Sequence, residues 1–213
     1  MSYLSFHKEE EILCLTRDII KGGADVIQLR VANKSDKEFL SIATKIKKLT
    51  CKSKIPLIIN NRLDIALAID AEGVHLGQDD LPIESARKIA PQKLIGKSTH
   101  SLKEALKATK ETADYISIGP IFHSPTKPNL SPIGLNLISQ IKKKVKIPLI
   151  AIGGINLNNI KQVLKAGVEG VAICSAITEA SDPKTTTRTF KKLLSDLAKA
   201  DARNHKLQAP NNK

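Results

Sequence analysis

The sequence predicts a parallel α/β fold, a single (β/α)8 (TIM) barrel. Short apolar runs alternate with amphipathic segments seven times clearly, and eight times if a weak first strand counts. Such alternation is typical of a parallel sheet with crossover helices. The 213 residues suffice for a lean barrel. An open doubly wound sheet is the alternative, but the GxGxxG turn that usually follows its first strand is missing.

The strands are predicted from short runs rich in Val, Ile and Leu that end in polar residues or glycine. The clearest is 147–152, which stops at Gly153-Gly154 before a segment opened by Asn156 and Asn159. Glycine lets backbone N–H groups approach an anion closely. The expected strands are 3–6, which is short, 25–30, 56–61, 73–77, 93–98, 114–119, 147–152 and 170–174.

The helices are predicted from apolar residues recurring at helical spacing. Gly22-Gly23 ends the first helix, and Ser35 caps the second. The expected helices are 9–21, 35–46, 63–69, 83–90, 102–112, 134–144, 157–166 and 186–199, with a turn or short helix at 175–182. Residues 1–200 form one domain. The polar segment 201–213 is expected to be a disordered tail.

The composition narrows the class of partner. A net charge of +13 suits either a nucleic-acid surface or a lysine-rich surface around a site for anionic small molecules. The lysines are spread over the chain, and only 3% of residues are aromatic, so stacking platforms for bases are lacking. We therefore expect small-molecule substrates and no nucleic acid, and we consider a homodimer as the assembly.

Cysteine usage and hydropathy predict the compartment. The three cysteines are an odd number without CxxC spacing, which favours a reducing cytosol over a disulfide framework or a zinc site. No apolar stretch is long enough to span a membrane, and residues 1–11 contain no apolar signal core. A cytoplasmic protein that binds no membrane is the expectation.

Polar side chains follow the predicted strands, where the active site of such a barrel lies. They comprise two cations, two carboxylates, several hydroxyls and two backbone turns that suit an anion. They are Gln28 and Arg30, Asn60 and Asn61, Asp79 and Asp80, Ser98 and His100, Ser124 to Lys127, Gly153-Gly154, and Cys174-Ser175. Carboxylates beside cations indicate a Mg²⁺–pyrophosphate site, and the turns after the last two strands indicate a second phosphate.

Each of these residues also has a purely structural interpretation. Arg30 could pair with a neighbouring carboxylate, and Asp79 and Asp80 could cap a helix. Ser98 and Ser175 could likewise be caps, and Lys127 could be solvated. His75 is expected to be a packed core residue rather than a ligand. Cys174 is not expected to be a nucleophile, since no acyl-transfer triad accompanies it.

Several stretches together resemble the thiamine phosphate synthase family and its relative, the thiazole tautomerase. They run in family order from Gly22 to Ile177 and include Val26 to Arg30, Ile58 to Asp64, Gly73 to Asp80, Ser98 to His100, Gly119 to Phe122, Ser124 to Lys127, Ile152 to Ile155 and Ser175 to Ile177. The resemblance implies a transferase that joins hydroxymethylpyrimidine diphosphate to thiazole phosphate. The pyrimidine–oxygen bond would break dissociatively while Mg²⁺ and basic residues hold the departing diphosphate.

The resemblance also implies roles for single residues. Arg30, Ser98 and Lys127 resemble the catalytic group, and Gln28 and Asn60 help to hold the pyrimidine diphosphate. Ser124 and Thr126 resemble a loop pair at the thiazole phosphate. Gly154, Cys174 and Ser175 resemble its backbone donors. Asp80 resembles a Mg²⁺ ligand, with Asn61 at the position of the other.

Three departures from the family pattern bear on activity. Asn61 stands where the family usually has Asp, Ala32 stands where it usually has Lys, and the first strand is short. The loop Asn33-Lys34-Ser35 is like that of the tautomerase, but Pro120 occupies the position of the tautomerase's catalytic histidine. A synthase is the favoured interpretation. A tautomerase, a degenerate phosphate-binding paralogue and a non-catalytic binding protein remain alternatives.

Overall fold

A computed structural model describes residues 2–3, 8–124 and 129–208 of the chain. Within these residues, parallel strands form one sheet in chain order, from β1 to β8. The strands are β1 (Ser2–Tyr3), β2 (Ile27–Arg30), β3 (Leu57–Asn60), β4 (Gly73–Leu76), β5 (Leu94–Thr99), β6 (Tyr115–Ile118), β7 (Leu149–Ile152) and β8 (Gly170–Ala172). The parallel α/β fold and the order of its elements confirm the prediction.

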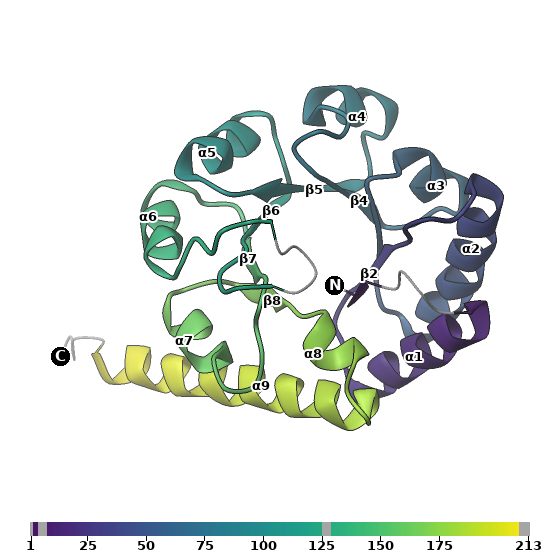
Figure 1. The fold of residues 1–213 in the computed structure, drawn as a ribbon. Helices are drawn as coiled ribbons and strands as arrows, with labels where there is room; N and C mark the ends of the chain where they lie inside the picture. The colour runs from purple at the N-terminus through teal and green to yellow at the C-terminus, as the bar shows by residue number, and fades with distance from the viewer. Residues whose placement is uncertain (1, 4–7, 125–128, 209–213) are drawn as a thin grey trace.

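Helices follow the strands and lie outside them. Figure 1 shows the strands around the centre of the molecule, with the helices in an outer layer coloured from purple to yellow along the chain. The helices are α1 (Glu9–Gly22), α2 (Asp36–Ser53), α3 (Leu63–Ala68), α4 (Ile83–Ile89), α5 (Leu102–Lys110), α6 (Asn136–Lys144), α7 (Ile160–Lys165), α8 (Ser175–Thr178) and α9 (Pro183–Gln208).

The core is aliphatic, as the low aromatic content predicts. Isoleucine and leucine fill it on both sides of the sheet, and β3 and β4 are buried along their whole length. Because all strands run in the same direction, their carboxyl ends meet at one edge, which we call the mouth. The strand register brings Asn60 beside His75, and Ser98 beside Ser117, near this edge. The opposite edge, where the strands begin, is the base.

The start of α2 and the end of α1 form where the sequence predicts, whereas α2 continues to Ser53, beyond the predicted 35–46. Ser35 and Glu38 make a reciprocal capping box at the start of α2, with the Glu38 N–H donating to Ser35 Oγ at 3.3 Å. Gly23 ends α1 with φ at +96°, a conformation that favours glycine. These local signals fix the start of α2 and the end of α1 on either side of β2.

Acidic residues brace the base in a repeated arrangement. Glu72 precedes β4, and its Oε2 accepts the Leu57 N–H at 2.8 Å at the start of β3. Its Oε1 accepts a hydrogen bond from Lys47 Nζ of α2 at 2.5 Å. Two further sets have the same design, namely Asp114 with Ile95 and Arg87, and Glu169 with Leu149 and Lys142. We call the three sets the base braces; each ties a helix and two strands together.

The first prediction concerns the base brace at Glu72. Burial alone would raise the pKa of Glu72, but hydrogen bonds from Lys47 and the Leu57 N–H outweigh it and leave the pKa below its usual 4.5. The stability from this shift is therefore present above pH 4.5 and is lost as the pH falls through the folded-state pKa. Glu72→Gln should lower the Tm at pH 7 by about 1–4 °C and flatten the decline of Tm in acid.

Thermal unfolding followed by circular dichroism between about pH 3 and 7 measures this effect. Glu10→Gln, at an exposed position of α1, is the matched control and should follow the curve of the unaltered protein. A Glu72→Gln curve parallel to that of the unaltered protein at every pH would contradict the role given to this carboxylate.

The ends of the chain differ from the prediction. The last helix begins at Pro183, because Asp182 accepts the Thr185 N–H at 2.9 Å and proline suits the first helical position. It continues to Gln208, so residues 201–208, which we expected in a disordered tail, are helical; residues 209–213 lie outside the described residues. Of the predicted strand 3–6, only residue 3 is described, and it lies in β1.

Two further observations concern the chain as a whole. No helix within the described residues has the length and apolarity that a membrane span requires. The cysteines carry free thiols: Cys14 and Cys51 are exposed, and Cys174 is partly buried at the mouth.

Candidate active site

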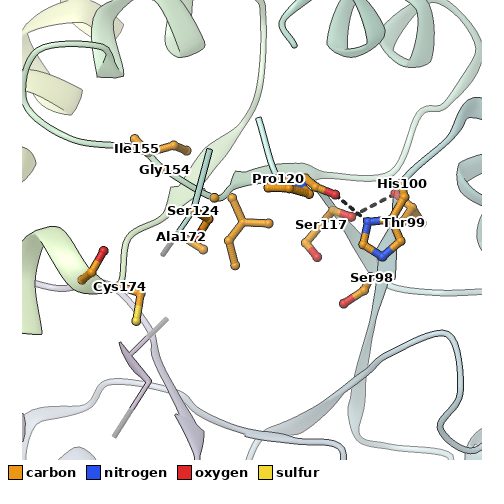
Figure 2. A pocket seen from close by; sticks show the side chains of 14 residues that line it. Ser98, Thr99, His100, Ser117, Pro120, Ser124, Gly154, Ile155, Ala172 and Cys174 are labelled. Atoms are coloured by element: carbon orange, nitrogen blue, oxygen red, sulfur yellow. Dashed lines mark hydrogen bonds between the residues drawn. The ribbon is translucent and has the colours of Figure 1, made fainter. Parts of the chain in front are cut away.

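A cavity that is partly open to solvent lies at the mouth. Its walls come from the carboxyl ends of β5, β6, β7 and β8 and the loops that follow them. Figure 2 shows Ser98, Thr99 and His100 along one side, and Cys174 across the cavity from them. The cavity brings together seven of the strand-end residues predicted from the sequence: Ser98, His100, Ser124, Gly153, Gly154, Cys174 and Ser175.

Hydrogen bonds fix the wall formed by β5 and β6. Thr99 Oγ1 donates to the Ser117 carbonyl at 2.9 Å, and His100 Nδ1 lies 2.5 Å from the Gly119 carbonyl oxygen (Figure 2). Both contacts join β5 or its following loop to β6. The wall that presents Ser98 is therefore held by neighbouring strands as well as by its own backbone ladder.

The glycine turn after β7 forms the opposite wall. Gly153 has φ at +97° and Gly154 at +65°, both in the left-handed region. A Cβ on Gly154 would lie 2.3 Å from the carbonyl oxygen of His123, so only glycine allows the two loops to approach this closely. Asn159 Nδ2 donates to the Gly154 carbonyl at 2.9 Å and holds the turn. The turn thus presents backbone to the cavity, as an anion site requires.

A buried polar network lies between the strands below the mouth. His75 is 1% exposed, with Nε2 2.9 Å from Ser98 Oγ and Nδ1 3.0 Å from the Tyr115 hydroxyl. Ser117 Oγ lies 3.2 Å from the same Nε2. His75 is therefore a hydrogen-bonded core residue, as predicted, and it orients the Ser98 hydroxyl.

Gln28 belongs to the same network through Tyr115. Burial raises the pKa of Tyr115, and a hydrogen bond with the Gln28 side chain opposes that rise. Gln28 Oε1 is nevertheless buried without a hydrogen-bond partner, the single such side-chain atom among the described residues. A buried acceptor left unpaired is costly, so this oxygen is available for a donor that a ligand supplies.

Arg30 connects the two halves of the predicted site. It ends β2, and partial burial lowers the pKa of its guanidinium, while the nearby Asp80 and Cys174 oppose that shift. Asp80 belongs to the β4–α4 loop and Cys174 lines the cavity. The Arg30 charge therefore lies within electrostatic reach of both the carboxylate and the cavity.

Asp80 stabilises its own loop instead of capping a helix. Its Oδ2 accepts the Gly77 N–H at 2.6 Å, while the N-cap of α4 is Pro82. Asn61 adopts φ of +67°, and its N–H donates to the His75 carbonyl at 2.8 Å. Its side-chain oxygen accepts a hydrogen bond from Asn60 Nδ2. Asn61 and Asp80 thus follow neighbouring strands.

These two residues suit a metal that shares its ligands with a substrate. No cluster of three His, Cys, Asp or Glu side chains with metal-ligand geometry occurs in the described part of the chain. Mg²⁺ commonly uses one or two protein carboxylates and takes its remaining ligands from phosphate and water. The Asp80 carboxylate and the Asn61 amide oxygen are hard donors of that kind, so the donor set fits a diphosphate-bound Mg²⁺.

A protein-family model described as thiamine monophosphate synthase matches residues 4–177. The chain belongs to the thiamine monophosphate synthase family. The family's enzymes are transferases of thiamine biosynthesis, and this chain is one of them. The resemblance to the thiamine phosphate synthase family seen in the sequence is therefore confirmed.

The thiamine-phosphate synthases of two bacteria are similar over most of both chains. That of Chloroflexus aurantiacus is 45% identical over 177 residues, 83% of this chain and 82% of the relative. That of Clostridium novyi is 45% identical over 188 residues, 87% of this chain and 92% of the relative.

Solved structures agree with the family and the fold. The thiamine phosphate pyrophosphorylase of Pyrococcus furiosus superposes with a TM-score of 0.82 at 41% identity and covers 86% of this chain and 89% of its own. A 3-hexulose-6-phosphate synthase superposes with a TM-score of 0.71 at 22% identity, covers 90% of this chain and 96% of its own, and supports the fold alone.

The structure shows the surroundings of two positions at which the sequence departs from the expected family pattern. Ala32 stands where the family usually has Lys, and the nearby Lys34 is turned towards α2, its Nζ 3.6 Å from Glu38 Oε1. Pro120, the position at which the sequence departs from the tautomerase pattern, lines the cavity.

Some predicted residues lie outside the cavity or outside the described residues. Thr126 and Lys127 fall in the segment 125–128, which the structure does not describe. Sequence reasoning missed Lys97, Tyr115 and Ser117, which surround Ser98 or the loop of Asp80. Ser117 sits on a predicted strand two residues before its glycine end, which could have indicated that its side chain faces the interior.

Proposed function

We propose that this member of the family joins hydroxymethylpyrimidine diphosphate to thiazole phosphate, forming thiamine phosphate and releasing diphosphate. The observation that carries the proposal is the position of Arg30, whose charge reaches both Asp80 and the cavity wall at Cys174. A cation placed between a carboxylate-bearing loop and an anion-binding cavity suits a reaction in which a diphosphate leaves beside a bound phosphate.

The pyrimidine diphosphate would occupy the space between Arg30, Gln28 and Ser98. The unpartnered Gln28 Oε1 would accept a hydrogen bond from the amino group of the pyrimidine. As the pyrimidine–oxygen bond breaks, its electron pair leaves with the diphosphate. Arg30 would stabilise the charge that develops there, and Lys127 would assist as the family resemblance implies. Ser98, held by His75, would hydrogen-bond the departing group.

The thiazole phosphate would bind in the mouth cavity. Its phosphate would rest on the backbone of Gly153-Gly154 and of Cys174-Ser175, with Ser124 beside it. The lone pair of the thiazole nitrogen would then form the new bond to the pyrimidine methylene carbon. No proton has to move in this step.

A Mg²⁺ ion held by Asp80, Asn61 and the diphosphate would neutralise part of the leaving group's charge when bound. Asp80 keeps its loop closed through Gly77, so its remaining oxygen lone pairs can face a ligand.

We also propose that the sheet closes into a full eight-stranded barrel by pairing β8 with β1. Contact between α8 and β1 supports this closure.

The second prediction tests the metal site at Asn61. Asn61→Asp adds a charged oxygen at nearly the same volume, and both residues tolerate the left-handed backbone at φ +67°. The Mg²⁺ concentration for half-maximal rate should fall by about tenfold, the equivalent of about 1.4 kcal/mol. Initial rates of thiamine phosphate formation, measured from both substrates across a Mg²⁺ titration, give this value.

Gln92→Glu, which adds the same charge at an exposed position of the base, should leave the Mg²⁺ titration unchanged. Coincident titration curves for Asn61→Asp and the unaltered protein would remove position 61 from the metal site. If the unaltered protein forms no thiamine phosphate at any Mg²⁺ concentration but converts the thiazole alone, the tautomerase alternative replaces the synthase.

A further inference from the structure

A buried lysine lies beneath the loop that carries Asp80. Lys97 is 7% exposed on β5, and its side chain points away from the mouth cavity because the adjacent Ser98 points into it. It lines a second cavity, partly open to solvent, between the β4–α4 loop and α5. Asp80 and three charged residues of α5 or its end, Glu104, Lys107 and Glu111, line the same cavity.

Lys97 ties the β4–α4 loop to β5. Its Nζ donates to the Gly77 carbonyl at 2.6 Å. The same residue closes the loop, since the Gly77 N–H donates to Asp80 Oδ2 at 2.6 Å and the Asp80 nitrogen lies 3.4 Å from the Gly77 carbonyl oxygen. One residue further along, the Gln78 side chain donates to the Ser98 carbonyl. Lys97 and Ser98, which are adjacent in β5, therefore bind Gly77 and Gln78, which are adjacent in the loop.

Stability of the fold alone does not account for a cation at this position. Burial lowers the pKa of Lys97, and the nearby Asp80 and Glu111 only oppose that effect. Its pairing group at 2.6 Å is a neutral carbonyl rather than a carboxylate. A buried cation that pairs with a neutral carbonyl carries a desolvation cost that the hydrogen bond offsets only in part. The presence of Lys97 is best explained by its hydrogen bond to the β4–α4 loop.

We propose that Lys97 is a positioning residue that holds the Gly77–Asp80 turn against β5 and keeps the Asp80 carboxylate directed at a Mg²⁺–diphosphate. This inference rests on the proposed function, because it assigns Lys97 to the site that binds the leaving group. Lys97 does not touch the substrate; it acts through the Gly77 peptide group and through its charge beside Asp80.

The third prediction uses Lys97→Met, which removes the charge while keeping the length and volume of the side chain. Binding of inorganic diphosphate to the purified protein is measured by titration calorimetry at several Mg²⁺ concentrations. We expect about tenfold weaker diphosphate binding in Mg²⁺ and a higher Mg²⁺ requirement, with a Tm equal to or above that of the unaltered protein. A residue needed only for folding would lower the Tm instead.

Lys107→Met is the matched control. Lys107 lines the same cavity, but its side chain is 73% exposed and pairs with Glu111 at 3.6 Å, so its loss should change diphosphate affinity by less than about twofold. Affinity of Lys97→Met within twofold of the unaltered protein overturns the proposal, as does an equal loss in both variants. If Lys97→Met does not fold, Lys97→Gln is judged by the same two criteria.

The two proposals fail in different ways. If the unaltered protein binds no diphosphate in Mg²⁺, the proposed site for the leaving group is wrong and the role of Lys97 falls with it. If the unaltered protein binds diphosphate and Lys97→Met binds it equally well, only the role of Lys97 is wrong.

Discussion

Arg30→Met is expected to lower kcat/KM for thiamine phosphate formation by about 100- to 1000-fold. Methionine keeps much of the length of the arginine side chain but removes the charge that reaches both Asp80 and Cys174. Negative charge grows on the diphosphate as the pyrimidine–oxygen bond breaks. The lost cation should therefore destabilise the transition state more than the bound substrate, and kcat should fall more than KM rises.

Steady-state rates with each substrate varied in turn separate these two parameters. Arg17→Met, at an exposed position of α1, is the control for the change in net charge and should stay within about twofold of the unaltered enzyme. A kcat for Arg30→Met within fivefold of the unaltered enzyme would mean that another group carries the leaving-group charge.

Asp80→Asn is expected to have the second largest effect. The Mg²⁺ concentration for half-maximal rate should rise by about 30- to 100-fold, the equivalent of about 2–2.7 kcal/mol. Asparagine can still accept the Gly77 N–H that Asp80 accepts at 2.6 Å, so the loop should keep its shape. The change then reports the loss of a charged ligand and not the loss of the turn.

A Mg²⁺ titration of initial rate measures this shift. Asp79→Asn makes the same substitution at the exposed neighbouring residue. It should change the Mg²⁺ concentration for half-maximal rate by less than about threefold. Adding Asn61→Asp to Asp80→Asn should recover part of the lost affinity, since a carboxylate would again follow one of the two neighbouring strands. An unchanged midpoint in Asp80→Asn would exclude this carboxylate from the metal site.

The parts of the site that follow strand ends could be predicted from the sequence. Arg30, Ser98 and Gly154 all lie where an apolar run stops, and parallel strands bring their carboxyl ends to one edge. The residues that meet there could thus be named without knowing any contact. Gly153-Gly154 carried its own signal, because the pair lies between a buried strand and an amphipathic segment.

Interactions made across the fold could not be predicted in this way. Lys97 stands within a strand pattern, and its bond to the Gly77 carbonyl depends on how the β4–α4 loop folds back. The same holds for the contact between His75 and Tyr115, which joins β4 to β6 past the intervening β5. Lys34 and Glu38 are four residues apart, a spacing that allows an ion pair. Whether the long Lys34 side chain takes this partner or turns to the mouth depends on the tertiary structure, so the sequence alone could not decide it.

The base braces divide the chain into modules, and two loops of the candidate site lie at the joints between them. Each brace lies within one stretch of chain, from α2 to β4, from α4 to β6, or from α6 to β8. The connections between these modules are the β4–α4 loop, which carries Asp80, and the β6–α6 loop, which carries Ser124. These two loops can therefore change in length or sequence without disturbing the anchors at the opposite edge.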